Sequence, residues 1–453
     1  MFKKNQIIDI KTEKLAFGGL GVATHEGLKI FVAGTVPGDE AKIRISKKKK
    51  NYAEGRIVEL LKPSTKRIQA KCKHFGVCGG CTWQFLSYED QLFYKEQIVK
   101  ESLEHLGGFK DVSVNKIIGC ANPWNYRNKM EFSFAYNEQK EVSLGLHPKG
   151  YHYDVFELTE CHLPSPVYAQ IVSTVRTWAR ENKVPVYESK TEQGLLTNLV
   201  IRHNQAGDHL INIITRKGAL PNTHELKEAL KDFNIVAAFH TQVNALTGKS
   251  TTRITGKLWG EEHLQETLNL PEPWGKLQFK IYPDAFFQPN PDQAKILYQL
   301  ALEAANIQPT DTVLDLYCGT GTLGLFASRK AKRVIGIDNV PDAIKSAEAN
   351  AIDNQISNAE FFVGDAAEKL KELNLQADIA LVDPPRAGLM PQAVELIGKL
   401  PLERLVYVSC NPTTQARDLK ELAKYGFVIK SVQPVDMFPH TYHIENVVVF
   451  EKF

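Results

Sequence analysis

The first residue that suggests chemistry is a cysteine at the end of a predicted strand. Residues 405–419 read LVYVSCNPTTQARDL, so Cys410 follows five mostly apolar, β-favouring residues and precedes Asn411-Pro412 at the start of a predicted helix. Open α/β sheets place their ligand crevices at the carboxyl ends of strands. Free cysteines are also commonly buried for packing alone. On this segment by itself, both a packing role and a catalytic role for Cys410 stay open.

A glycine loop follows a second predicted strand. TVLDL (312–316) runs into YCGTGTLG, in which Gly319, Gly321 and Gly324 fit the pattern G-x-G-x-x-G, and Asp338 ends the next strand 19 residues after Gly319. Glycines let the backbone turn tightly and approach a ligand, and the acid accepts hydrogen bonds from ribose hydroxyls. NAD(P) and S-adenosylmethionine both fit this template, because each carries an adenosine ribose.

A third strand end narrows the chemistry. The predicted strand DIALV leads to Asp383-Pro384-Pro385-Arg386. A dehydrogenase needs a proton donor for its carbonyl substrate, and the sequence offers no obvious one beside this sheet. An aspartate with a rigid di-proline and a nearby thiol instead favours a flat heterocycle held against a nucleophile. Methyltransferases of base amino groups favour an aromatic residue after the di-proline, so Arg386 argues against that class.

Four further cysteines have spacing that suggests a metal centre. Cys72, Cys78 and Cys81 form C-x5-C-x2-C, and Cys161 follows far downstream in LTECHLP. Structural zinc usually uses paired C-x2-4-C or Cys/His knuckles, whereas three close thiolates and a remote fourth also satisfy a [4Fe–4S] cluster. Zinc and packed free thiols remain alternatives. Cys120 and Cys318 are predicted to pack in the core.

Composition and charge favour a soluble protein that binds a polyanion. The chain is 43% apolar and 24% charged, with no run near the length of a membrane span and no export signal, so a reducing cytoplasm is expected. Its net charge of +3 is uneven: residues 42–73 hold twelve Lys or Arg against Glu54 and Glu59. That segment carries +10 and the remainder −7, which predicts contact with a polyanion.

The predicted elements divide the chain into three parts. Residues 1–62 contain about five short strand candidates separated by turns, which is typical of an OB-like barrel. A helix is predicted over 88–108, and a mixed pattern follows to about 270 with a helix near 166–182. From about 280, strands and helices alternate as in a doubly wound parallel sheet. We predict a β-barrel domain (1–62), a central α+β domain (63–270) and a Rossmann-like α/β domain (271–453).

The strand-end motifs together resemble a known family. ALVDPPRAG, LVYVSCNPTT, FFQPN (286–290) and HIENVVVF (443–450) are similar to segments of RNA (uracil-C5)-methyltransferases. The resemblance covers essentially the whole chain, since the N-terminal part resembles a TRAM domain and residues 126–129 resemble a central-domain motif. It is strongest to the 23S rRNA (uracil-5-)-methyltransferases that carry both a TRAM domain and a [4Fe–4S] cluster.

This resemblance implies methylation of uridine C5 with S-adenosylmethionine. It makes Cys410 the nucleophile that adds to carbon 6 of uracil and Glu445 the base that removes the proton from carbon 5. The residues that it implies for S-adenosylmethionine are Gln288, Tyr317, Asp338 and Asp383, the last lying between cofactor and uracil. The cluster ligands that it implies are Cys72, Cys78, Cys81 and Cys161.

Several alternatives stay open on the sequence. The substrate is expected to be 23S rRNA, with the T-loop uridine of tRNA as the second possibility. An NAD(P)-linked oxidoreductase leaves Cys410, Asp383 and Glu445 unexplained, and a non-catalytic RNA-binding protein has no use for them. We expect a monomer with no obligate protein partner and no membrane association.

Overall fold

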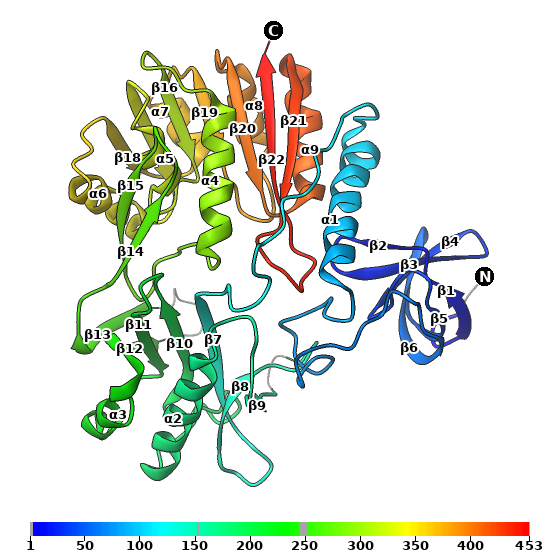
Figure 1. Ribbon diagram of the computed structural model, residues 1–453, viewed down its shortest axis with the longest axis vertical. Helices are drawn as coiled ribbons and strands as arrows, with labels where there is room; N and C mark the ends of the chain where they lie inside the picture. The colour runs from blue at the N-terminus through cyan, green and yellow to red at the C-terminus, as the bar shows by residue number, and fades with distance from the viewer. Residues whose placement is uncertain (1–2, 152–153, 245–251, 453) are drawn as a thin grey trace.

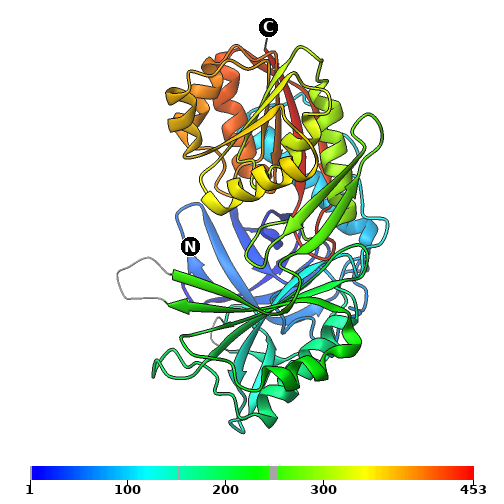
Figure 2. The same ribbon diagram turned by 90° about the vertical axis from the view of Figure 1, so that its left-hand side faces the viewer.

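The computed structural model describes residues 3–151, 154–244 and 252–452, and Figures 1 and 2 show three parts. A small N-terminal sheet lies beside a large C-terminal α/β part, and a second sheet with two helices lies across from both. Within the described ranges, no helix is long and apolar enough to cross a membrane.

The N-terminal sheet has six strands, where about five were predicted. They are β1 (Ile7–Lys11), β2 (Lys14–Ala16), β3 (Leu20–His25), β4 (Leu28–Ala33), β5 (Glu40–Lys48) and β6 (Tyr52–Lys62). Their order is β1-β5-β6-β4-β3-β2, yet β1 also contacts β3, so the sheet curls around its own core. Alternation directs the apolar side chains inward, as with Ile8 and Ile10 in β1 and Ile43 and Ile45 in β5. This arrangement confirms a small N-terminal β-module.

Fewer cations of residues 42–73 are free to contact a polyanion than the net charge of this segment suggests. Four consecutive lysines, residues 47–50, begin inside a strand, since β5 continues through Lys48. Several of its cations have acidic partners: Lys42 with Glu59 (3.6 Å), Lys47 with Glu54 (2.9 Å), Lys66 with Asp90, Arg67 with Asp39 (2.6 Å) and Lys73 with Glu160 (3.7 Å). Arg44 and Arg56 are exposed and face each other across β5 and β6. Like charges in this position repel, and a bound phosphate would relieve the repulsion.

The central sheet has seven strands in the order β13-β12-β11-β10-β7-β8-β9. They are β7 (Lys129–Tyr136), β8 (Val142–Leu146), β9 (Phe156–Glu157), β10 (Leu196–His203), β11 (His209–Thr215), β12 (Ile235–Asn244) and β13 (Thr252–Gly260). The predicted helix near 166–182 is confirmed as α2 (Val167–Glu181), which packs through Ile171, Val175 and Trp178 on the sheet. A shorter helix, α3 (Thr223–Ala229), and the 3-10 turn η2 (Lys231–Phe233) accompany it.

The C-terminal sheet has the order β18-β17-β16-β19-β20-β22-β21. Its strands are β16 (Thr312–Leu316), β17 (Arg333–Asp338), β18 (Ala359–Val363), β19 (Ile379–Val382), β20 (Arg404–Ser409), β21 (Phe427–Val435) and β22 (Glu445–Lys452). The first five run parallel, and β22 is antiparallel to both of its neighbours. This confirms the predicted doubly wound α/β fold.

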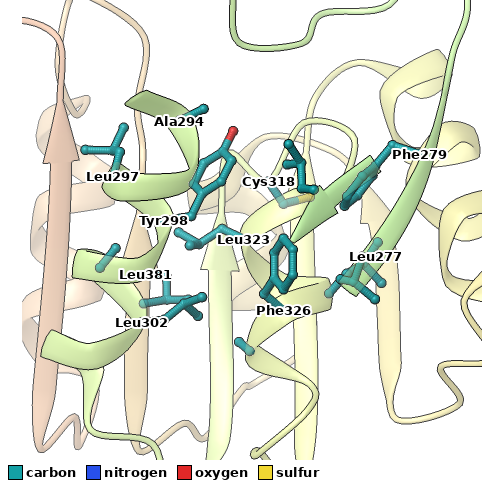
Figure 3. Packing of buried hydrophobic residues seen from close by; sticks show 14 of the residues in the cluster. Leu277, Phe279, Ala294, Leu297, Tyr298, Leu302, Cys318, Leu323, Phe326 and Leu381 are labelled. Atoms are coloured by element: carbon teal, nitrogen blue, oxygen red, sulfur yellow. The ribbon is translucent and has the colours of Figure 1, made fainter. Parts of the chain in front are cut away.

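Helices cover both faces of this sheet. They are α4 (Pro291–Ala305), α5 (Thr322–Ala327), α6 (Pro341–Asp353), α7 (Ala366–Glu372), α8 (Pro391–Lys399), α9 (Pro412–Leu422) and the 3-10 turn η3 (Ala423–Tyr425). Along β16, Val313 joins the core beneath α4, α5 and α6, whereas Leu314 and Leu316 join the core on the opposite face. Strands buried on both faces need such continuous apolar sequence. Figure 3 shows Cys318 in the first core, among Leu323 and Phe279.

Two elements that precede the C-terminal sheet belong to its cores. Helix α1 (Tyr88–Ser102) runs into a π-helical turn, η1 (Leu103–Gly107), which ends at Gly108 with φ of 81°. Its buried side packs with β20 and β22. The hairpin of β14 (Leu264–Asn269) and β15 (Lys276–Ile281) packs with α4. The division of the chain at residues 62 and 270 stays a prediction, since packing crosses these positions.

Candidate active site

The predicted site residues meet at one edge of the C-terminal sheet. Strand order reverses between β16 and β19, and ligands bind outside such a reversal at the carboxyl ends of the strands. Tyr317, Asp338, Asp383 and Cys410 follow or end β16, β17, β19 and β20 there. Because Ser409 pairs with Asn446, Glu445 at the start of antiparallel β22 occupies the register position opposite Cys410.

Hydrogen bonds join the segment after Cys410 to the segment Asp383-Pro384-Pro385-Arg386. The Asn411 carboxamide caps α9 by accepting from Thr413 N (3.1 Å), and its Nδ2 donates to the Arg386 carbonyl (3.0 Å). Thr414 Oγ1 donates to the same carbonyl (3.2 Å). These bonds join two segments about 25 residues apart next to the thiol, and they fix the Arg386 carbonyl there.

The carboxyl groups and the thiol disfavour one another's charged forms. Burial raises the pKa of Cys410 to about 11, and Glu445 and Asp383 add to that rise, whereas Arg386 opposes it. Burial also raises the pKa of Asp383 to about 7. The pKa of Glu445 is raised well above its usual range by burial and by Asp383. The two carboxyl groups therefore disfavour ionisation of each other, and both disfavour the thiolate.

The glycine loop is shaped by two aspartates and two glycine conformations. Gly319 N donates to Asp338 Oδ2 (2.9 Å), and Gly324 N donates to the buried Asp315 (2.8 Å). Gly319 and Gly321 have φ of 55° and 78°, values that other residues rarely adopt. A Cβ on Gly321 would clash with Ala347, whereas a Cβ on Gly319 would meet open space. The loop is therefore packed behind and open in front, as a nucleotide ligand requires.

The segment that carries Gln288 is held by the central part of the chain. Asn128 N donates to the Pro289 carbonyl (2.7 Å), and the buried Arg202 donates through Nη2 to the Ala285 carbonyl (2.9 Å). Gln288 is largely buried in this segment. The open face of the glycine loop fits a polar ligand such as S-adenosylmethionine.

One residue at this edge was not singled out from the sequence. Asp365 follows β18, accepts from Ala367 N (2.9 Å) as the cap of α7, and contributes to raising the pKa of Tyr317. It lies at the same edge of the sheet as Asp338. The available signal was the position of an acid just after a parallel strand, but helix capping alone also explains Asp in that place.

The four predicted metal-binding cysteines converge. Cys72, Cys78, Cys81 and Cys161 all line one cavity beside β8. Burial raises the pKa of Cys81 to about 12 and of Cys161 to about 11, with further rises from the neighbouring thiols. In residues 3–151, 154–244 and 252–452, no three His, Cys, Asp or Glu are grouped so as to hold a metal ion. The sequence separation of 80 residues between Cys81 and Cys161 is closed by the fold.

Residues 71–83, which we call the cysteine loop, also connect the central and C-terminal parts of the molecule. Gly79 N donates to the His147 carbonyl of the central part (3.2 Å). Lys73 N donates to Glu160 (2.7 Å), next to Cys161. Thr82 N donates to the His440 carbonyl of the C-terminal part (3.0 Å). The backbone of the cysteine loop therefore bonds to loops of both the central part and the C-terminal part.

Comparison with known proteins agrees with this geometry. Residues 203–453 match the family model of tRNA (uracil-5-)-methyltransferase, and residues 2–58 match that of the TRAM domain. An uncharacterized RNA methyltransferase of Caldanaerobacter subterraneus is 38% identical over 99% of both chains. Another from Chlorobaculum tepidum is 39% identical over 95% of this chain and 92% of its own.

A solved structure shows the same architecture with a ligand. The Pyrococcus abyssi tRNA (uracil-54, C5)-methyltransferase, in complex with S-adenosyl-L-homocysteine, is 26% identical and has a TM-score of 0.75 over 98% of this chain and all of its own. These matches exclude the oxidoreductase and the non-catalytic alternatives, and they support S-adenosylmethionine as the methyl donor. The chain belongs to the tRNA (uracil-5-)-methyltransferase family of RNA-modifying enzymes.

Proposed function

We propose that this enzyme methylates C5 of uridine in RNA through a covalent adduct on Cys410, with Glu445 as the general base. The observation that carries the proposal is the register of β20 and β22, which sets Cys410 opposite Glu445 at the edge where β19 delivers Asp383. Methylation of uracil C5 by this route requires a thiol that reaches carbon 6 and a carboxylate that reaches the proton on carbon 5 of the same ring.

The chemistry follows from the weakness of uracil C5 as a nucleophile. Addition of the Cys410 thiolate to carbon 6 forms a sulfur–carbon bond and moves the double-bond electrons toward carbon 5 and oxygen 4. Carbon 5 can then take a methyl group. Glu445 removes the remaining proton from carbon 5, and the sulfur–carbon bond breaks to restore the ring. Cysteine suits this role because its thiolate is strongly nucleophilic and leaves readily.

S-adenosylmethionine supplies the electrophilic methyl group when it is bound. We propose that Asp338 holds its ribose hydroxyls, that Gln288 and Tyr317 contact the rest of the molecule, and that Asp383 lies between it and the uracil. Support comes from the open face of Gly319 and from the hydrogen bonds that Asp338 makes at the glycine loop. Asp338 also accepts from Val340 N through Oδ1 (2.9 Å), which orients its carboxylate.

The test separates the two steps. Cys410→Ala should lose turnover and covalent capture of RNA that contains 5-fluorouridine. In Glu445→Gln, the Cys410 thiolate should still add to carbon 6, and carbon 5 should still receive the methyl group. A covalent enzyme–RNA species should therefore accumulate with ordinary uridine RNA and be visible on a denaturing gel. Normal methylation by Cys410→Ala would refute the proposal.

We further propose that Cys72, Cys78, Cys81 and Cys161 bind a [4Fe–4S] cluster. A single zinc would bring four sulfurs to about 3.8 Å from one another, given zinc–sulfur bonds of about 2.3 Å. A cluster attaches each thiolate to a different iron, so it can be held by four thiols that line one cavity. Iron and sulfide analysis of anaerobically purified protein tests this, and zinc at one equivalent would contradict it.

We propose 23S rRNA as the substrate of a monomeric, cytoplasmic enzyme. The grounds are the sequence resemblance and the four clustered cysteines. The T-loop uridine of tRNA is the alternative, favoured by the tRNA substrate of the Pyrococcus abyssi relative. Mapping 5-methyluridine in rRNA and tRNA from cells with and without the gene decides between them.

A further inference from the structure

The connection between β21 and β22 leads directly to Glu445. Val435 pairs with Glu445, so residues 436–444 form a loop closed by the two strands. Figure 1 shows this connection extending from the edge of the C-terminal sheet toward the junction with the other parts. We call residues 436–444 the base loop. Its conformation fixes where β22 begins and therefore where the Glu445 carboxyl lies.

The first half of the base loop is anchored by buried groups of α1. Lys95 donates to Asp436 Oδ1 (2.6 Å), and both side chains are fully buried. Lys95 also donates to the Phe438 carbonyl (3.0 Å), and Tyr88 donates to Asp436 Oδ2 (2.9 Å). Asn290, at the start of α4, donates to the Met437 carbonyl (3.0 Å). Each of these residues lies more than 140 positions away in the sequence.

The second half is held at His440, which has an unusual backbone conformation. Its φ is 66°, a left-handed value that costs free energy for a residue with a side chain and persists only where surroundings enforce it. His440 N donates to Gln91 Oε1 (2.8 Å), and its carbonyl accepts from both Thr82 N and Trp83 N (3.0 Å each). Three hydrogen bonds thus hold the backbone of this strained, buried residue, and its ring Nδ1 lies 3.2 Å from Gln91 Nε2.

The His440 ring has its own partner. It stacks on Trp124 with ring centroids 3.6 Å apart and planes 20° apart, and Lys71 lies 5.0 Å above the Trp124 ring. Lys71 precedes Cys72, and Thr82 follows Cys81. Thr82, which donates to the His440 carbonyl, is therefore adjacent to Cys81, and Lys71, which lies over the Trp124 ring, is adjacent to Cys72.

We propose that His440 is a positioning residue that couples the cysteine loop (residues 71–83) to the general base. When the cysteine loop is ordered, its backbone donors hold His440 in the left-handed conformation, and the base loop places Glu445 for proton removal. When the cysteine loop loosens, His440 relaxes and Glu445 moves. This inference rests on the proposed function, because it assigns a role to Glu445 as base.

The step that should fail is elimination. In His440→Ala, thiol addition and methyl transfer should persist, while removal of the carbon 5 proton should slow about 100-fold, the scale of a 1 Å misplacement. The variant should therefore accumulate the covalent species with uridine RNA, with KM for RNA little changed. His440→Asn should recover part of the rate, because Asn tolerates the left-handed conformation.

Substitutions outside the base loop provide the matched comparison. Trp124→Leu removes the stacked ring and should also accumulate adduct. Trp178→Leu removes an equally large buried indole from α2, remote from the base loop, and should not. If Glu445→Gln traps adduct and His440→Ala does not, the coupling is wrong and the proposed function stands. If Glu445→Gln traps none, the proposed function itself fails.

A measurement without turnover tests the link to the cysteine loop. Hydrogen exchange of the base-loop amides should be at least tenfold faster after iron is removed from the purified protein with a chelator, while amides of β16 should be unchanged. Equal exchange in the base loop before and after treatment would overturn the coupling.

Discussion

Replacing Lys95 with methionine should destabilise the C-terminal part of this enzyme strongly. Lys95 and Asp436 are fully buried and 2.6 Å apart. Removing one partner of such a pair leaves an uncompensated buried charge and costs about 3–5 kcal/mol. Tyr88 and the amide of Phe438 still donate to Asp436 (2.9 and 3.1 Å), so we expect the lower half of that range. For a part of this size, that predicts a fall of about 6–16 °C in melting temperature.

The assay is differential scanning calorimetry of the full chain, with two comparisons. Lys14→Met breaks a pair of the same length, Lys14–Glu101 at 2.6 Å, but both side chains are partly exposed. It should cost no more than about 1 kcal/mol. Lys95→Met with Asp436→Asn removes the unpaired charge and should recover much of the loss. The reasoning is refuted if Lys95→Met falls no further than Lys14→Met, or if the double variant melts as low as the single one.

Three other outcomes are expected. S-adenosylmethionine at about 100 times its Kd should stabilise the protein by about 2.7 kcal/mol in calorimetry, NADH should not, and Asp338→Ala should weaken the effect; stabilisation by NADH alone would contradict the site assignment. Because the pKa of Cys410 is raised to about 11, its thiolate fraction is small at neutral pH and should grow about tenfold per pH unit from pH 7 to 9. The rate at which a neutral disulfide reagent labels the Cys410 peptide, followed by mass spectrometry, should rise in the same proportion. A plateau of this rate near pH 8 would argue against that pKa. Arg44→Ser with Arg56→Ser should weaken RNA binding and reduce the log–log salt slope by about 1.4, whereas Lys47→Ser, which removes a cation already paired with Glu54, should change it less.

The strand ends were predictable from the sequence because their signals are local. Cys410, Asp383 and Asp338 each end or follow a short apolar run, and parallel strands bring such positions to one edge. That Cys81 and Cys161 lie close together was predicted from the metal-binding chemistry of thiols rather than from the periodicity of apolar residues. Pairing between residues far apart gave no comparable signal. Lys95 is 341 positions from Asp436, and nothing in an amphipathic helix pattern marks one lysine as buried.

The ion pairs of the cations in the N-terminal part could not be predicted from the sequence for a related reason. Counting residues treats every cation as free, but the cross-strand register of β5 and β6 sets Lys42 against Glu59 and places Lys47 beside Glu54. A one-residue change in register would alter these partners. The bulges in this strand pair cannot be located from composition, so the partners of these lysines required the structure.

The position of β22 within the C-terminal sheet has a consequence for synthesis of the protein. β21 joins the sheet only through β22, which lies between it and β20. Until residues 445–452 have left the ribosome, the open edge of β20 has no partner strand, and Cys410 stands at its end without Glu445. The nascent chain therefore lacks the proposed general base until this strand has emerged. It also carries an exposed apolar strand edge during that interval, which is a hazard for aggregation and a natural point of contact for a chaperone.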